Sequence, residues 1–243
     1  MINSAHEVWI RQLERSTPLL DFEREALRAV PVKVRKLEPH TDIVCDGDKP
    51  TQCCMIIDGF CWRYKMTSGG NRQILSVHMP GEMPDLQSLH LTSMDHTLAS
   101  ITRAEIGLVA HQSLRELTRR FPHLTDALWR STLIDSAIFR QWLVGLGART
   151  AYQRIAHLFC EMAVRQAVGN EPAQSIVLPL TQIELGDALG LSAVHVNRSL
   201  RDLREAGLAL VERGVVQILD YEGLKRAGDF DPGYLQLQFV DRA

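Results

Sequence analysis

The 243-residue sequence has no long apolar run. A helix that crosses a bilayer needs about 18 or more consecutive apolar residues, and no such stretch occurs. The first residues, MINSAHEVWIRQLERS, are polar and charged and lack the apolar segment of a secretory signal peptide. We therefore expect no membrane contact and a cytoplasmic location. The 45% hydrophobic content is enough to form cores in one or two domains.

The short motifs of the common enzyme classes are also absent. The sequence contains no G-x-S-x-G, no C-x-x-C and no phosphate-binding glycine loop. A cupin-like metal-dependent enzyme would be the alternative to a binding protein, but its H-x-H metal pair is missing. Four histidines have a spacing that matches no metal motif, and we interpret them as loop or edge residues: His78, His90, His96 and His111.

Cysteine is scarce and its count is odd, which argues against a disulfide framework. The five cysteines are Cys45, Cys53, Cys54, Cys61 and Cys160. An iron–sulfur cluster normally needs four well-placed thiolates, and the adjacent Cys53 and Cys54 would point to opposite faces of a strand. A hairpin turning at Asp58-Gly59 would bring Cys54 near Cys61, so a thiol redox pair stays open as an alternative. We favour small buried hydrophobic side chains.

Positive charge is not in excess. The net charge is −2, and residues 151–243 contain nine Lys and Arg against twelve Asp and Glu. This balance does not favour a nucleic-acid partner. The local distribution is different, because no acidic residue occurs from Leu191 to Arg201. The charge on one helix face, rather than the domain total, decides whether DNA phosphates are attracted.

Residues 180–208 carry the signals of two helices joined by a short turn. Thr181 and Glu184 have the capping-box spacing that begins a helix. Gly190 suits the left-handed residue that ends it, and Ser192 can cap the next helix. Helical spacing places three apolar residues on the inward face of that second helix: Val196, Leu200 and Leu203.

The opposite face of the second helix has the chemistry of a DNA reader. Arg can bind guanine O6 and N7, Asn can bind adenine, and an apolar side chain can contact the thymine methyl. Four residues of these types share the face: Val194, Asn197, Arg198 and Arg201. We predict that helix 192–204 enters the major groove of DNA. Further DNA contacts are predicted at Thr181, Gln182, Ser192, His195, Ser199 and the hairpin-tip residue Arg213.

The segment GLSAVHVNRSLRDLREAGL resembles the recognition segment of the Crp/Fnr family of bacterial transcription regulators. The likeness covers nearly the whole chain. It implies an α+β fold with a cyclic-nucleotide-binding-like β-roll, a long dimerisation helix and a C-terminal winged helix-turn-helix. It also implies a homodimer on a palindromic double-stranded operator, with RNA polymerase as a further partner. Arg198 takes the place of the family's guanine-reading arginine, whereas Val194 stands where many members carry a base-reading glutamate.

This organisation divides the chain into three parts. Residues 1–121 are expected to hold N-terminal helices and the sensory roll, 122–147 the dimerisation helix and hinge, and 148–243 the DNA-binding domain. Turn signals separate the strands expected in the roll: Cys53–Ile57, Phe60–Lys65, Gln73–His78 and Leu98–Ala110. The long helix begins at Pro122, keeps a broad apolar face through Leu124, Leu128, Ile134, Ile138 and Trp142, and is expected to be interrupted by Gly145 and Gly147.

The resemblance implies an effector pocket whose chemistry departs from cyclic AMP binding. Gly81 and Glu82 match the family's phosphate-loop pair, although a plain turn is the interpretation we prefer. His96 and Thr97 replace the Arg-Ser anion partner, and Asp85 adds the wrong charge. Phe139 and Arg140 replace the adenine-contacting pair of the long helix. Cyclic AMP is thus disfavoured, as is the iron–sulfur cluster of one branch, which uses cysteines near the N-terminus. Another effector, or constitutive DNA binding without one, stays open.

Overall fold

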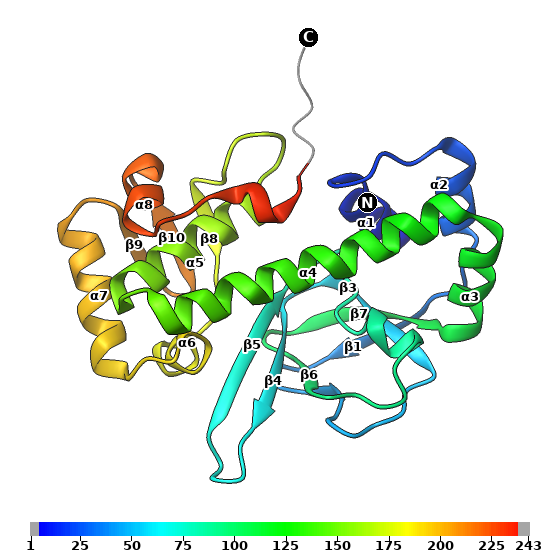
Figure 1. Cartoon of the computed structure of the whole chain (residues 1–243), viewed down its shortest axis with the longest axis horizontal. Helices are drawn as coiled ribbons and strands as arrows, with labels where there is room; N and C mark the ends of the chain where they lie inside the picture. The colour runs from blue at the N-terminus through cyan, green and yellow to red at the C-terminus, as the bar shows by residue number, and fades with distance from the viewer. Residues whose placement is uncertain (1–4, 238–243) are drawn as a thin grey trace. The chain divides into compact units, whose positions relative to one another are not determined.

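A computed structural model describes residues 5–237 (Figure 1). They fall into two compact units, with the boundary between Ser136 and Ala137. Among residues 5–237, none of the helices is long and apolar enough to span a bilayer.

The first unit begins with two short helices, α1 (Ala5–Glu14) and α2 (Asp21–Arg28). The apolar face of α1 is buried, with Trp9 only 1% exposed. Helix α2 begins with Leu20 at the cap position. There the Glu23 carboxylate accepts the Leu20 N–H at 2.9 Å. The Glu23 side chain therefore satisfies the free backbone N–H group at the start of the helix.

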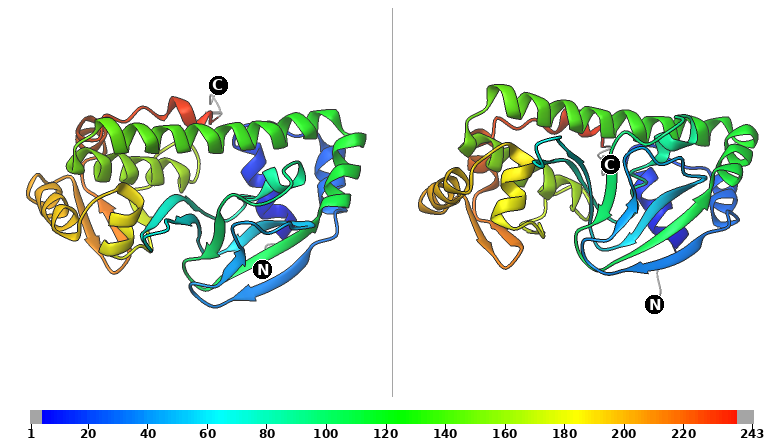
Figure 2. Two further views of the ribbon diagram at one scale, coloured as in Figure 1. Left: turned by 60° about the horizontal axis from the view of Figure 1, so that its bottom comes forward. Right: turned by 90° about the horizontal axis from the view of Figure 1, so that it is seen from below.

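Two antiparallel sheets form the roll that follows. One has the order β1 (Lys33–Leu37), β7 (Ala104–Ala110), β3 (Gln52–Asp58). The other has the order β2 (Asp42–Val44), β6 (Thr97–Ser100), β4 (Cys61–Met66), β5 (Arg72–His78). Figure 2 shows the strands from two further directions. The single strand predicted at Leu98–Ala110 is wrong, because a bend at 101–103 sends its two halves, β6 and β7, into different sheets.

The cysteines of the roll follow the predicted alternation. Cys53 packs in the apolar cluster that contains Trp9 and Leu124, whereas Cys54 and Cys61 pack together in a second cluster with Ile106. The predicted hairpin between β3 and β4 is wrong, since β3 pairs with β7 and β4 with β5 and β6. Four cysteines are buried, and Cys45 alone of the five is exposed. Burial raises the pKa of Cys53 and of Cys61 to about 12, which keeps both thiols protonated.

The first unit also contains helical segments, and the last of them continues into the second unit. They are η1 (Leu86–Leu89), α3 (His111–Arg120) and α4 (Pro122–Ala148). The start of α4 at Pro122 is as predicted. The interruption at Gly145 and Gly147 is wrong, because α4 is continuous to Ala148. Instead α4 ends at Ala148, and after residues 149–150 the next helix begins with the Thr150 hydroxyl as its cap.

In the second unit, helices pack on α5 (Ala151–Arg165), whose Ile155 and Phe159 are fully buried. Around it lie α6 (Gln182–Leu189), α7 (Ala193–Glu205), α8 (Tyr221–Ala227) and η2 (Pro232–Leu235). A small antiparallel sheet has the order β8 (Ser175–Val177), β10 (Val215–Ile218), β9 (Ala209–Glu212). Strand β8 contacts α5 and β9 contacts α7. The unit is a helix-turn-helix followed by the predicted hairpin wing.

The turn at Gly59 generates a test of the roll. Gly59 has φ +84°, and a Cβ there would lie 2.9 Å from Ala104 Cα and closer still to the Arg103 carbonyl. Gly70 has φ +80°, with open space around a Cβ. We expect Gly70→Ala to cost about 1 kcal/mol of unfolding free energy from the left-handed backbone alone. Gly59→Ala should cost about 3 kcal/mol or more because it adds a backbone clash. Equal losses in urea unfolding would contradict the close approach.

Candidate nucleic-acid interface

The turn between α6 and α7 is built by local hydrogen bonds that the sequence predicted. Thr181 Oγ1 accepts the Glu184 N–H at 3.2 Å, and the Glu184 carboxylate accepts the Thr181 N–H at 2.8 Å. Gly190 adopts the left-handed conformation, with φ +62°, at the end of α6. This left-handed backbone favours glycine, and a Cβ there would also lie 2.9 Å from the Leu146 side chain, which would have to shift.

Helix α7 has one inward and one outward face. The Ser192 hydroxyl caps it by accepting the His195 N–H at 3.3 Å. Val196 and Leu203 are buried as predicted, and Leu200 is half-buried. Ser199 is a correction: it was predicted to contact a phosphate, but it is only 4% exposed. It lies three residues after Val196, so the helical period turns it inward.

The outward face presents the four predicted base-reading side chains. Val194 is 67% exposed, and Asn197, Arg198 and Arg201 are also exposed. Their surroundings differ. Asn197 Nδ2 donates to the Ala193 carbonyl at 2.9 Å, and Arg201 has the carboxylates of Asp202 and Glu205 at 3.7 and 3.8 Å. Within residues 5–237, Arg198 forms no hydrogen bond or ion pair, so its five N–H donors are available to a ligand.

A hollow of about 730 Å³ adjoins this face. Its lining includes Gln182 of α6, the four predicted base-reading residues of α7, and Leu210, Val211 and Glu212 of β9, with Phe159 of α5 and Leu178 and Leu180 beside them. The predicted contacts Thr181, Gln182 and His195 are exposed, and the wing tip at Arg213 is exposed with φ +49°. The recognition face and the wing edge thus border one concave surface.

Three of the residues assigned to an effector pocket, Gly81, Glu82 and Thr97, make other contacts. A Cβ on Gly81 would lie 2.5 Å from Gln12 Cβ, so this glycine packs against α1. Glu82 accepts the His78 Nδ1–H at 2.8 Å. Thr97 Oγ1 accepts the Asp46 N–H at 3.1 Å. Phe139 and Arg140 are exposed on α4.

The histidines differ from their predicted places in loops and at edges. His78, His96 and His111 are buried, and only His90 is exposed among the four. Burial lowers the pKa of His96, with a further lowering from the nearby Arg63 guanidinium. His96 Nδ1 pairs with Asp95 at 2.7 Å, while its buried Nε2 has no hydrogen-bond partner in residues 5–237. Within that range, no three His, Cys, Asp or Glu side chains come together as a metal site.

Two charged side chains of the roll, Arg63 and Asp85, make contacts that the sequence did not predict. Arg63 of β4 donates to Asp135 Oδ2 of α4 at 2.5 Å and to the Pro84 carbonyl. Asp85, 2% exposed, accepts the Cys54 N–H at 2.7 Å. Burial raises the pKa of Asp85 to about 7, against the lowering effect of the Cys54 N–H and Arg63. Both partners of Arg63 lie far from it in sequence, so no local pattern could have revealed them.

Two parts of the chain match known protein families. Residues 153–227 match the family described as "Crp-like helix-turn-helix domain", and residues 34–121 match "Cyclic nucleotide-binding domain". The chain belongs to the Crp/Fnr family of transcription regulators. Members of this family bind DNA through the helix-turn-helix, and they form dimers. The two matches coincide with the roll of the first unit and the winged helix-turn-helix of the second.

Individual relatives agree with this membership. The nitrogen fixation regulation protein FixK of Rhizobium meliloti is 27% identical over 80% of this chain and 87% of its own length. The transcriptional activator FnrA of Stutzerimonas stutzeri is 25% identical over 83% of each chain. The solved structure of FixK2 from Bradyrhizobium japonicum shares the fold, with a TM-score of 0.74 over 82% of this chain and 98% of that one, at 24% identity.

The raised pKa of Asp85 predicts a pH dependence of stability. The folded chain holds this proton at pH values where the unfolded chain has lost it. Stability is therefore lost as pH rises from about 4 to about 7 and stays low above. Between pH 5 and pH 8 we expect the wild type to lose about 2–3 kcal/mol more unfolding free energy than Asp85→Asn.

Denaturant unfolding at several pH values measures this difference. Subtracting the variant also removes the opposite contribution of His78, His96 and His111, whose pKa values burial lowers. Asp126→Asn, at an exposed carboxyl of α4, is the matched control and should follow the wild type. Parallel curves for the wild type and Asp85→Asn would refute the buried titration.

Proposed function

We propose that the chain is a homodimeric, cytoplasmic, sequence-specific regulator that binds a palindromic operator and acts on RNA polymerase at promoters. One observation carries the proposal: α7 exposes an unpaired arginine, an asparagine and a valine on a face without any carboxylate from residue 191 to 201. A recognition helix with this face has donors for purines and an apolar surface for thymine.

The surroundings of each side chain suggest its role. Arg198, with no partner of its own, is assigned to guanine O6 and N7. Arg201 has two carboxylates nearby that reduce its net charge, so we assign it a weaker contact at the edge of the site. Thr181, Gln182, His195 and Arg213 surround the base-reading face and are assigned to phosphates, which fix orientation without reading sequence. Ser192 is exposed at the start of α7, where its hydroxyl serves as the cap, and it is assigned to a phosphate as well.

The dimer is proposed to form along α4. The apolar face expected to pair with a second copy is largely used within the chain, because Leu124, Leu128, Ile138 and Trp142 are buried. A different row is exposed, at alternating steps of four and three: Trp129, Leu133, Ser136, Arg140 and Leu143. This is the spacing of a coiled-coil seam, and Trp129 on it is 65% exposed. A second copy of α4 is the occupant that such a row fits, and a dimer gives the two half-sites that a single reading helix requires.

Constitutive binding is the second candidate, and the roll provides the observation that favours it. Arg63 is a partly buried cation of the roll that could receive an anionic effector, yet Asp135 and the Pro84 carbonyl already accept from its two terminal nitrogens, and only its Nε–H has no partner among residues 5–237. Selection from random duplex DNA with purified protein tests both candidates. A recovered palindrome with half-sites about one turn apart supports the regulator. Equal enrichment with and without candidate anions would favour the constitutive form, and no enrichment under any condition would refute sequence-specific binding.

Arg198→Ala should weaken operator binding by about 1–3 kcal/mol and relax the base preference at one position per half-site, because a bidentate guanine contact is removed. Titrations on the operator and on single-base variants measure both effects. The control is Arg226→Ala, which removes an exposed arginine from α8 without touching the reading face. An Arg198→Ala protein with wild-type affinity and wild-type preference would contradict the assignment.

Leu133→Glu should dissociate the dimer. Two leucines per dimer would leave a buried seam and two carboxylates would face each other, so we expect at least about a hundredfold weaker dimer. Sedimentation equilibrium measures the dissociation constant. Arg130→Glu introduces the same side chain on α4 outside the exposed row and should leave the dimer intact. Loss of the dimer in Arg130→Glu but not in Leu133→Glu would place the interface elsewhere on the helix.

A further inference from the structure

Residues 228–237, here called the C-terminal strap, continue beyond the part of the chain that matches the helix-turn-helix family. The strap is well anchored in the second unit. Phe230 and Leu235 are 5% and 2% exposed. A Cβ on Gly228 would lie 2.6 Å from the His157 backbone nitrogen, so the strap begins in direct contact with the α5 backbone. Burial of two large apolar side chains indicates a packed element rather than a passive tail.

The strap reaches a buried carboxylate in α5. Glu161 is 0% exposed and accepts three donors from three segments. Trp142 Nε1 of α4 donates at 3.3 Å, Arg165 of α5 at 3.1 Å, and the Tyr234 hydroxyl of the strap at 2.8 Å. Burial and the neighbouring Glu161 raise the pKa of Tyr234, so the hydroxyl keeps its proton and donates it. A buried carboxylate must keep such donors, because losing one leaves charge that is not compensated.

His157 provides a second anchor for the strap. Its Nδ1–H donates to the Gly228 carbonyl at 3.1 Å. Its ring stacks on Tyr234, with 11° between the planes and 6.0 Å between centroids, and meets Phe230 edge-on at 5.1 Å. Three aromatic rings in these arrangements limit how the strap can move on α5.

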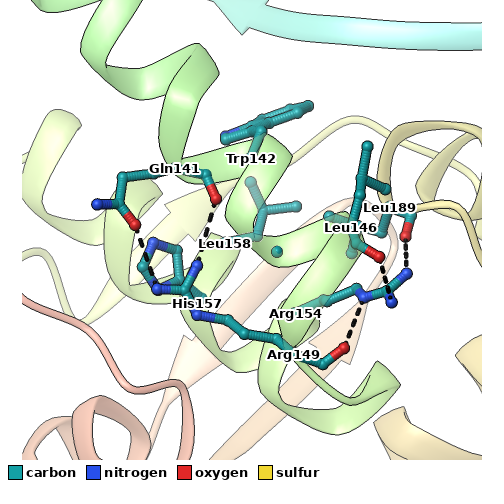
Figure 3. A pocket seen from close by; sticks show the side chains of 9 residues that line it. Gln141, Trp142, Leu146, Arg149, Arg154, His157, Leu158 and Leu189 are labelled. Carbon is teal, nitrogen blue, oxygen red and sulfur yellow. Dashed lines mark hydrogen bonds between the residues drawn. The ribbon is translucent and has the colours of Figure 1, made fainter.

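The end of α4 is also held by two arginines (Figure 3). Arg154 donates to the carbonyls of Leu146 and Arg149, and to that of Leu189 at the end of α6. Arg149 donates to the Gln141 carbonyl and side chain, and its guanidinium lies 3.8 Å from Asp229 of the strap. The carbonyls that a helix leaves open at its C-terminus are thereby tied to α5, α6 and the strap.

These contacts join two surfaces of the proposed function. The last turns of α4 carry Leu143 of the exposed row, whereas α7, the reading helix, packs on α5. Trp142, the neighbour of Leu143 in sequence, is attached to α5 through Glu161. In a dimer paired along α4, the separation of the two reading helices depends on how rigidly α4 is attached to α5. A rigid attachment makes affinity depend steeply on the distance between half-sites.

We propose that the C-terminal strap, acting through Tyr234 on Glu161, is a positioning element that sets the selectivity of the dimer for half-site spacing. This inference rests on the proposed function. Tyr234 contacts no DNA in this scheme and acts only through the attachment of α4 to α5. Loss of the strap therefore leaves each half-site contact unchanged while allowing the two reading helices a wider range of separations.

The test uses full-length protein and a series of operators in which the spacer between half-sites is changed by one base pair in either direction. The wild type should lose about tenfold or more in affinity on each changed spacer. Tyr234→Phe should lose about threefold or less, because the loose attachment tolerates the change. Tyr152→Phe is the matched control, since this α5 hydroxyl has no hydrogen-bond partner in residues 5–237.

A second variant guards against a local effect of the ring substitution. Deletion of 230–243 removes most of the strap, including Phe230 and Tyr234, and deletion of 238–243 is its length control. Thermal unfolding and single half-site binding confirm that each protein is folded and reads DNA. Unchanged spacer selectivity in both Tyr234→Phe and the 230–243 deletion would overturn the strap proposal and leave the regulator intact. A wild type that prefers no palindrome at all would instead overturn the proposed function beneath it.

Discussion

The carboxylate of Glu161 is the constraint on which the second unit depends. A charge that is fully removed from water destabilises the fold unless donors surround it. Here the donors come from α4, α5 and the C-terminal strap. The carboxylate therefore requires Trp142, Arg165 and Tyr234 to be in place together. Apolar packing around α5 supplies most of the stability, whereas this one group specifies which segments meet and in what geometry.

The first unit solves the same problem differently. Its polar groups form several small separate clusters, among them Arg63 with Asp135, His78 with Ser76 and Glu82, and Asp85 with a backbone N–H. A partly buried arginine that is already paired with a carboxylate gains little from a second anion, because the incoming anion would leave Asp135 without its partner. An anionic effector would thus have to compete with a group of the protein itself. This competition, together with the replaced anion partner at His96 and Thr97, favours the constitutive alternative.

The sequence predicted the features that arise from local chemistry. The Thr181–Glu184 box, the left-handed Gly190, the Ser192 cap and the start of α4 at Pro122 each depend on residues within one turn of chain. Prediction failed where a distant partner decides. The segment between Leu98 and Ala110 has the sequence pattern of one strand, but its two halves pair in different sheets. Ser199 is a polar residue that was expected at the surface, but it lies on the inward face of α7 and is buried. The C-terminal strap has no periodicity that would reveal its contacts with α5.

The reading face also determines which bases it cannot recognise. Cytosine presents its N4 amine in the major groove, and a carboxylate is the side chain that accepts from it. Helix α7 has no carboxylate among its outward residues before Asp202, and Val194 is exposed where a glutamate would supply one. A valine can contact the thymine methyl but accepts no hydrogen bond. Under the proposed assignment, discrimination at that base pair would come from apolar contact and shape. Guanine opposite Arg198 would then be the strongest single source of sequence preference in the half-site.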